Sequence, residues 1–130
     1  MLSSVLMCLA LNVYHEARSD SMIGQYAVAH VVLNRVQSDR YPDNVCDVVH
    51  QGYSKGKHKC QFSWYCDGKS DTPTDHRAWA LASLVAYDVM MGTVPDVTDG
   101  ATHYHATYVK PYWADHYTKT VQHGSHIFYK

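Results

Sequence analysis

Glutamate is almost absent from this chain of 130 residues: Glu16 is the only one, and the other acidic residues are all aspartates. Glutamate forms helices well and is common on their solvated faces, so a chain with one copy has not used it as surface filler. Glu16 lies at the polar end of an apolar N-terminal segment. Partial burial there would raise the pKa of its carboxyl, which makes Glu16 a natural general acid. The alternative is that Glu16 merely pairs with Arg18 or another cation.

The chain also lacks a strong charge of either sign and a long apolar run. Its formal net charge of -1 excludes the basic footprint of a nucleic-acid-binding protein, so we expect no nucleic-acid partner. The apolar stretch 1–13 is too short to span a bilayer, and it lacks the basic start and the cleavage site of a secretion signal. We therefore interpret it as the first core helix and expect neither membrane insertion nor an export signal in this chain.

Cysteine is scarce, and its spacing does not match a zinc knuckle or ribbon. Cys8 lies on the apolar first segment and is predicted to be a buried thiol. Cys46, Cys60 and Cys66 fall in a loop-rich region and can supply one disulfide, whose pairing the sequence leaves open. A disulfide would suit a protein that works outside the cytosol.

Tyrosine, tryptophan and histidine are abundant, with 11, 3 and 10 copies. Tyrosine and tryptophan offer stacking surfaces with a polar tip, which suit sugars and other amphipathic ligands. The length fits one domain, residues 1–130, built around one core.

Apolar periodicity and capping residues predict a mainly helical chain. Helices are predicted from Ser3 or Ser4 to about Ala17, over about 21–38, as a short helix at 44–50, and from Thr74 or Asp75 to about Met91. Residues 51–74 read as a long irregular segment, and 102–108 and 126–129 as short extended pieces. This pattern predicts an α+β fold, mainly α, with long irregular loops and little β-structure. The active cleft is expected where the end of the first helix meets the loops.

Three clusters combine a carboxyl, hydrogen-bonding side chains and ring faces: residues 14–18, 61–64 and 103–105. Polysaccharide sites are built from such parts, because a pyranose ring has an apolar face and a polar edge.

Together and in this order, the clusters resemble the cell-wall hydrolase family that includes the spore-cortex-lytic enzyme SleB and related phage endolysins. The matching stretches are Tyr14-His15-Glu16-Ala17-Arg18, residues 24–29 and 32–36, Tyr41-Pro42, Cys60-Gln61-Phe62-Ser63, residues 100–104 and residues 124–129. The resemblance implies a lysozyme-like, lytic-transglycosylase-like fold that acts on peptidoglycan glycan strands. It also implies that Glu16 is the catalytic acid.

The resulting hypothesis is a muramidase or lytic transglycosylase that cleaves the β-1,4 bond between N-acetylmuramic acid and N-acetylglucosamine. Asp20 is a weak candidate for a second catalytic carboxyl, since Ser19-Asp20-Ser21 reads better as a helix cap; Asp67 and Asp99 have no motif behind them. Without a second acid, the 2-acetamido group of the substrate can stabilise the developing charge. Glu16 would then activate the sugar's 6-hydroxyl, which gives an anhydro product, or water; the resemblance favours the anhydro product.

Eight residues are predicted to bind substrate: Tyr14, Gln61, Phe62, Ser63, Trp64, His103, Tyr104 and His105. Tyr14 and Tyr104 are suited to hydrogen-bond the carboxyl or the acetamido group. For Phe62 a buried position is favoured, and for Trp64 core packing and sugar stacking are equally open.

Four further residues are given structural roles. Asn34 and Arg35 are expected to hold the base of the cleft through backbone hydrogen bonds, and His126 and Phe128 to lock the C-terminal segment into the fold. No cofactor and no metal ion are expected.

Two alternatives remain open. A zinc-dependent cell-wall amidase could use His103 and His105 with His126 or His15, although the His-Glu-x-x-His helix is missing. A non-catalytic wall-binding or virion protein could keep the fold without activity.

The expected partner is the glycan strand of peptidoglycan, and the protein is expected to bind it as a monomer. Without a repeat that resembles a wall-binding module, the chain is interpreted as a phage endolysin or an excised catalytic domain. An endolysin without an export signal would be made in the host cytoplasm, released by a holin, and would act outside the membrane.

Overall fold

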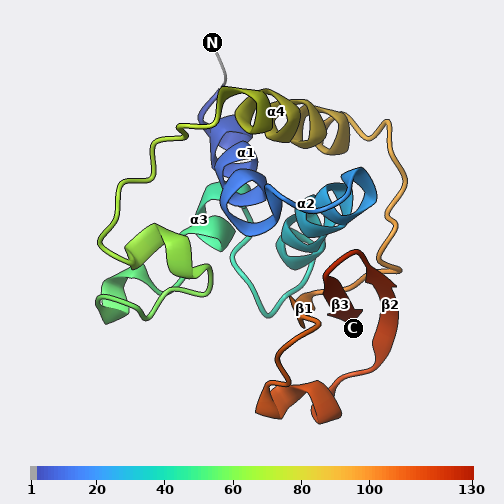
Figure 1. Ribbon diagram of the computed structural model, residues 1–130. Coiled ribbons are helices and arrows are strands. Elements are labelled where there is room, and N and C mark those ends of the chain that lie inside the picture. Colours follow the sequence, from blue (N-terminus) through green and yellow to red (C-terminus); the bar gives the residue numbers. More distant parts are fainter. Residues whose placement is uncertain (1–2) are drawn as a thin grey trace.

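The chain folds into four α-helices and one small antiparallel sheet, in a computed structural model that describes residues 3–130 (Figure 1). The helices are α1 (Ser4–Ala17), α2 (Met22–Val36), α3 (Val45–Val49) and α4 (His76–Met90); the strands are β1 (His103–Ala106), β2 (Lys119–His123) and β3 (His126–Tyr129). Short 3-10 helices occupy Tyr53–Lys55, Ser63–Cys66 and Tyr112–His116. The mainly helical α+β prediction is confirmed. The first two residues of the predicted helical stretch 1–13 lie outside the described residues.

The predicted helix starts are confirmed by the side chains that cap them. Ser3 accepts a hydrogen bond from the Leu6 N–H at 3.2 Å, and Ser21 accepts one from Gly24 at 3.2 Å. Such caps satisfy backbone donors that the first helical turn leaves unpaired. Asp75 caps α4 in the same way. Gly92 adopts a left-handed φ of 74° just beyond α4, which is a common way to end a helix.

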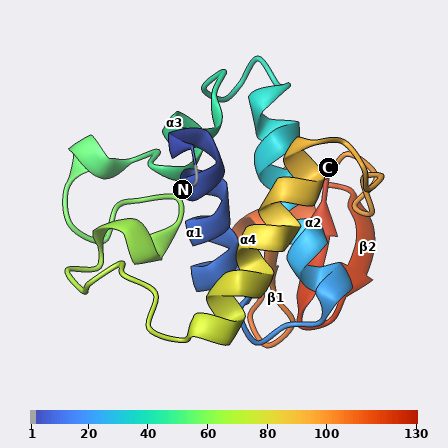
Figure 2. The ribbon, with the colours of Figure 1, turned by 90° about the horizontal axis from the view of Figure 1, so that it is seen from above.

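Helix α1 is the centre of the core. Its residues Leu9, Ala10 and Val13 are fully buried, and the helix packs against α2, α3 and α4. Figure 2 shows α1, α4 and α2 side by side, with the sheet next to α2. Helix α2 is therefore buried on a wide face, because Val28 and Val31 share a second apolar cluster with Phe128 of β3.

The sheet has the order β1-β3-β2, so the last strand of the sequence is the central one. In the β1–β3 register, Tyr104 lies opposite Phe128, which is fully buried. The predicted role of Phe128 in locking the C-terminal segment is confirmed. The sequence did not predict β2, because this edge strand is partly exposed and shows no clear alternation of apolar and polar residues.

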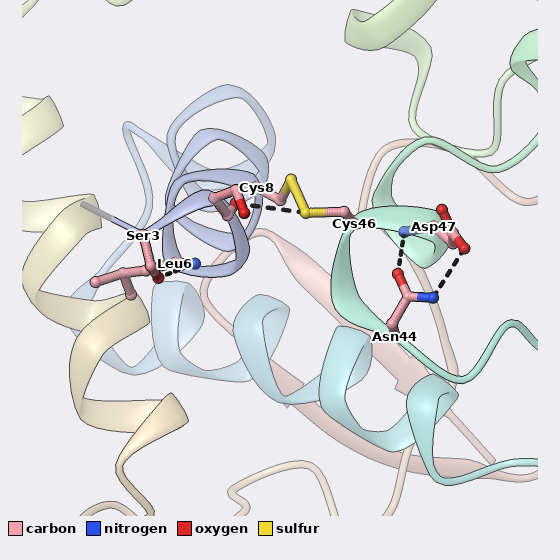
Figure 3. The surroundings of a disulfide bond; sticks show 7 residues. Ser3, Leu6, Cys8, Asn44, Cys46 and Asp47 are labelled. Atoms are coloured by element: carbon pink, nitrogen blue, oxygen red, sulfur yellow. Dashed lines mark hydrogen bonds between the residues drawn. A yellow bond between two sulfur atoms is a disulfide. The ribbon is translucent and has the colours of Figure 1, made fainter.

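Two disulfides replace the predicted single one, and Figure 3 shows the first of them, Cys8–Cys46. Cys8 pairs with Cys46 across a Cα–Cα distance of 5.3 Å, so the prediction of a buried free thiol at Cys8 is wrong. The physical reason is that α3 packs against α1 and brings Cys46 beside Cys8. The other bridge, Cys60–Cys66, closes a short loop within the long irregular segment.

None of the helices in residues 3–130 has the length and apolar character needed to cross a membrane.

Candidate active site

All three chemistry-bearing clusters of the sequence contribute to one pocket, which lies at the C-terminal end of α1. We call it the Glu16 pocket; it is lined by Glu16, Arg35, Gln61, Phe62, His103, Tyr104 and Trp113. Helices α1 and α2, the loop before the Ser63–Cys66 turn, strand β1 and the Tyr112–His116 turn supply these residues. The cleft therefore lies where the end of the first helix meets the loops, as predicted.

Glu16 is half-buried in this pocket, and the hydroxyl of Tyr104 donates a short hydrogen bond to its Oε1 atom. Burial raises the pKa of the Glu16 carboxyl above its usual value. The Tyr104 hydrogen bond and the nearby positive charge of Arg35 oppose this shift without cancelling it. The carboxyl is thus tuned to retain a proton at a higher pH than an exposed glutamate.

The alternative that Glu16 pairs with Arg18 is wrong. The Arg18 guanidinium points to the other side of α1, where it donates to the Tyr14 hydroxyl at 2.7 Å and lies over the Tyr14 ring. Among the described residues, Glu16 forms no ion pair.

Tyr104 is held by the sheet and is partly buried against its neighbours. Its ring packs edge-on against His126, with centroids 5.2 Å apart, and against Phe128 at 5.6 Å. Burial and the adjacent Glu16 carboxyl raise the pKa of Tyr104 well above its usual value. The phenol therefore stays protonated and remains a hydrogen-bond donor.

Asn34 and Arg35 hold the base of the cleft through backbone hydrogen bonds, as predicted. Asn34 donates to the Ala101 carbonyl at 2.9 Å, and Arg35 Nε donates to the Thr102 carbonyl at 2.8 Å. These two bonds fix the start of β1, and with it the position of Tyr104.

Arg35 also lines the pocket itself, which the sequence interpretation did not foresee. Its guanidinium lies over the rings of Tyr41 and Phe62, about 5 Å from each centroid, and the residue is only 5% exposed. It places a fixed positive charge beside the single carboxyl, where it can stabilise the carboxylate once the proton has left.

His103 is a neutral member of the pocket. Its pKa is lowered to about 4, first by burial and then by the positive charges of Arg35 and Arg40. The ring stacks on Tyr117 with centroids 4.1 Å apart, and Nε2 lies 3.3 Å from the Tyr41 hydroxyl. Nδ1 lies 3.0 Å from the Thr102 hydroxyl, so both ring nitrogens have a partner within the protein, and at neutral pH His103 adds no charge to the pocket.

Trp113 is the lining residue that the sequence analysis missed. It lies in the Tyr112–His116 turn and packs near His103, with ring centroids 5.2 Å apart. The adjacent aromatic residues Tyr112 and Trp113 were the only signal for it, since this part of the chain has no helical or strand period.

Several predicted substrate-binding residues lie outside the Glu16 pocket. Tyr14 is buried on the opposite side of α1, where its hydroxyl accepts from the backbone N–H groups of Thr74 and Asp75 at 3.2 and 3.0 Å. This hydroxyl ties the start of α4 to α1 and does not meet the Glu16 carboxyl, so of the two predicted roles of Tyr14 only a bond to the acetamido group of the substrate stays a prediction. Trp64 is buried and donates from Nε1 to Asn12 Oδ1 at 2.9 Å, which favours its core role.

Ser63 and His105 also lie away from the pocket lining. Ser63 is exposed at the start of a 3-10 helix. His105 is buried, with Nε2 2.7 Å from the Tyr129 hydroxyl and Nδ1 2.7 Å from the Ala106 carbonyl. Both ring nitrogens are thus occupied within the sheet, because His105 and Tyr104 point to opposite faces of β1.

Glu16 is the only acid among the residues that line this pocket. Asp20 binds His126 Nδ1 at 2.8 Å and also accepts from the Ser21 N–H, so it anchors β3 to the α1–α2 turn. This contact confirms the predicted locking role of His126. Asp67 lines a different hollow, and Asp99 occupies a turn with a φ of 56°.

The histidines of the zinc-amidase alternative are not gathered into a site. Within residues 3–130, no group of three or more His, Cys, Asp or Glu side chains is placed to hold an ion. His126 is engaged by Asp20, and His15 stacks on Trp64 at 4.6 Å while Nε2 meets the Asp71 carbonyl.

Comparison with known proteins gives a consistent result. A family model described as Cell Wall Hydrolase matches residues 19–129. A spore cortex-lytic enzyme from Halalkalibacterium halodurans is 34% identical over 96 residues, which cover 74% of this chain and 25% of that protein. The chain therefore spans about a quarter of the length of this curated relative.

Two solved structures resemble the whole chain. The catalytic domain of the germination-specific lytic transglycosylase SleB from Bacillus anthracis superposes with a TM-score of 0.73 at 25% identity, covering 100% of this chain and 97% of that one. The catalytic domain of Bacillus cereus SleB gives 0.69 at 26% identity, covering 100% and 93%. These matches confirm the predicted lysozyme-like fold. The family match begins at residue 19, so the argument for Glu16 rests on its geometry.

Proposed function

The chain belongs to the cell wall hydrolase family, and from this premise we propose that it cleaves peptidoglycan glycan strands with Glu16 as its single catalytic acid. The bond proposed is the β-1,4 linkage between N-acetylmuramic acid and N-acetylglucosamine. One observation carries the proposal: Glu16 is a partly buried carboxyl with a raised pKa, bonded to Tyr104, in a pocket that no other acid lines.

In the first step, protonated Glu16 donates its proton to the glycosidic oxygen as the bond to the anomeric carbon breaks. The raised pKa keeps this proton available near neutral pH. Because Tyr104 donates to Oε1, the other carboxyl oxygen is left to carry the proton. After transfer, the Tyr104 hydrogen bond and the Arg35 charge stabilise the new carboxylate.

The positive charge that develops on the sugar needs a partner other than a second carboxylate. Enzymes with two carboxylates hold them at about 5–9.5 Å, a pairing that the lining of the Glu16 pocket does not offer. The 2-acetamido group of the substrate is the proposed partner, through its carbonyl oxygen. The Glu16 carboxylate then removes a proton from the incoming nucleophile.

We propose that this nucleophile is the 6-hydroxyl of the same muramic acid, which gives a 1,6-anhydro product. The similarity to a domain named as a lytic transglycosylase supports this choice over attack by water.

The remaining lining residues would position the sugar. Gln61 is exposed and suited to a sugar amide or hydroxyl, whereas His103 would bind a sugar hydroxyl by exchanging its 3.3 Å contact with Tyr41. Trp113 offers a ring face to a pyranose. No cofactor and no metal are assigned to the reaction.

The biological setting is part of the proposal. We propose that residues 1–130 act as one catalytic unit and as a monomer, on the wall outside the membrane, in a phage endolysin released by a holin. The two disulfides fit an oxidising compartment.

Mass analysis of digested peptidoglycan tests the chemistry. Anhydro-muropeptides are the expected product; reducing ends would indicate water as the nucleophile, and free stem peptides would indicate an amidase. Digestion should continue in the presence of a chelator. Loss of activity that zinc restores would contradict the proposal.

A further inference from the structure

A second hollow lies in the long irregular segment and is lined in part by the Ser63–Cys66 turn. We call it the loop pocket; it is lined by Tyr53, Ser54, Gly56, Lys57, Tyr65, Cys66, Gly68 and Lys69. It is an open hollow with a volume of about 640 Å³, compared with about 160 Å³ for the Glu16 pocket. The proposed reaction uses none of these residues.

The floor of the loop pocket is aromatic and is held in place. The Tyr65 ring stacks on His50 with centroids 3.9 Å apart, and Tyr53 packs against Tyr65 at 5.3 Å. The Cys60–Cys66 disulfide and a 3.0 Å hydrogen bond from the His58 N–H to the Cys66 carbonyl close the loop around these rings. The shape of the hollow is therefore stabilised by ring stacking, a disulfide and a backbone hydrogen bond.

Its rim carries positive charge. Lys57 and Lys69 line the pocket, and neither forms an ion pair with another described residue. Lys57 lies directly over Gly68, where an added Cβ would come within 2.9 Å of its Cε atom. Gly68 also has a φ of 80°, so the turn that leaves room for Lys57 is one that glycine adopts readily.

Ring faces beside ammonium groups suit a ligand that has both a carbohydrate face and an anionic group. We propose that the loop pocket binds a carboxylate- or phosphate-bearing carbohydrate segment of the cell wall and so holds the wall beside the Glu16 pocket. The two pockets are close along the chain, because Gln61 and Phe62 line the Glu16 pocket and Tyr65 and Cys66 line the loop pocket. This inference rests on the proposed function, because it takes the wall as the ligand.

Binding to purified sacculi tests it, measured by co-sedimentation with Glu16→Gln protein so that cleavage does not interfere. Adding Lys57→Gln and Lys69→Gln should weaken binding by about three- to tenfold and reduce its dependence on salt. The matched control is Lys55→Gln with Lys59→Gln, which removes equal charge from exposed residues of the same loop outside the pocket lining. Equal losses in both pairs, or no loss in either, would overturn the proposal.

A second variant tests the aromatic residues of the loop pocket. Tyr53 is 62% exposed, so Tyr53→Ala should fold normally and lower affinity by about threefold. The control is Tyr108→Ala, which removes a ring that is 86% exposed elsewhere. Unchanged binding of Tyr53→Ala would overturn the assignment of a sugar ring to this pocket.

Two treatments of the sacculi identify the anion. One treatment removes wall phosphates, and the other converts free carboxyl groups to amides. Only one of the two should lower the affinity of the Glu16→Gln protein to that of its Lys57/Lys69 variant, and that treatment identifies the bound anion. If neither treatment changes the affinity, the proposal fails. If wild-type protein cleaves sacculi but the Lys57/Lys69 and Lys55/Lys59 variants bind sacculi with equal affinity, this inference fails and the proposed function stands. If wild-type protein releases no fragments, the proposed function fails.

Discussion

A tyrosine hydroxyl lies on each side of the C-terminal end of α1, but the two hydroxyls have different hydrogen-bond partners. On one side, which we call the acid side, Glu16 meets Tyr104 in a pocket with one acid and one buried guanidinium. On the other, the scaffold side, Tyr14 is saturated by donors from Arg18, Thr74 and Asp75. A tyrosine hydroxyl contacts the proposed catalytic acid on one side and ties two helices together on the other.

The difference comes from what each hydroxyl faces. Tyr14 accepts hydrogen bonds from backbone groups that a loop cannot pair elsewhere, so its loss should affect folding. Tyr104 donates to a carboxyl whose charge changes during the reaction, so its loss should affect turnover. The variants below separate these roles.

The largest expected effect is that of Glu16→Gln, which removes the proton donor and keeps the shape. Turnover should fall by roughly 10²- to 10⁴-fold while wall binding persists. The release of soluble fragments from sacculi measures turnover, and co-sedimentation with sacculi measures wall binding. Retention of more than a tenth of the activity would remove Glu16 from its assigned role.

The same variant has a stability signature. Burial raises the folded-state pKa of Glu16 above its ordinary 4.5, so the stability linked to its proton is present below that value and lost as pH rises through the folded pKa. Glu16→Gln should remove this decline and be as stable as wild type, or more stable, at neutral pH. Thermal unfolding across pH 4–8 checks the sign.

Tyr14→Phe should act on folding alone. It leaves the N–H groups of Thr74 and Asp75 and the Arg18 guanidinium without their acceptor, and a fall in Tm of about 5 °C is expected. Turnover per folded molecule should stay near that of wild type. A large loss of turnover at unchanged Tm would mean that the scaffold side is part of the catalytic site.

Replacing Cys60 and Cys66 by serine tests the loop that contributes to both sides. Opening this short bridge should cost about 2 kcal/mol, less than the roughly 4 kcal/mol expected for Cys8–Cys46 with its longer separation. Activity should fall more than in the Cys8/Cys46 variant, because Gln61 and Phe62 lie inside the Cys60–Cys66 loop. Denaturant unfolding and digestion rates measured on both variants give the two rankings.

Tyr104→Phe should have the smallest effect and the most informative one. Losing the hydroxyl removes a contact that stabilises the carboxylate, so kcat should fall by about tenfold. The same hydrogen bond lowers the pKa of Glu16, so that pKa should rise and the alkaline limb of the pH–rate profile should move to higher pH. A fall in rate without this movement would indicate a purely structural role.

Much of this molecule could be predicted from its sequence, and the exceptions share a cause. The caps Ser3, Ser21 and Asp75 are local signals, and they marked the helix starts correctly. The convergence of Glu16 with Tyr104 followed from the order of the motifs.

The failures all depend on tertiary neighbours. Cys8 meets Cys46 only because α3 packs on α1, and β2 exists because β3 offers it an edge. Trp113 enters the pocket from a turn with no period. Tyr14 and Tyr104 could not be told apart without knowing which side of α1 each one faces.

The position of β3 between β1 and β2 has a consequence for how the protein is made. A ribosome delivers both outer strands before the one that joins them, so until β3 has been made Tyr104 lacks the His126 and Phe128 rings against which it packs. The contact between Tyr104 and Glu16 would thus be completed only after β3, the last strand of the sheet, has paired with both neighbours.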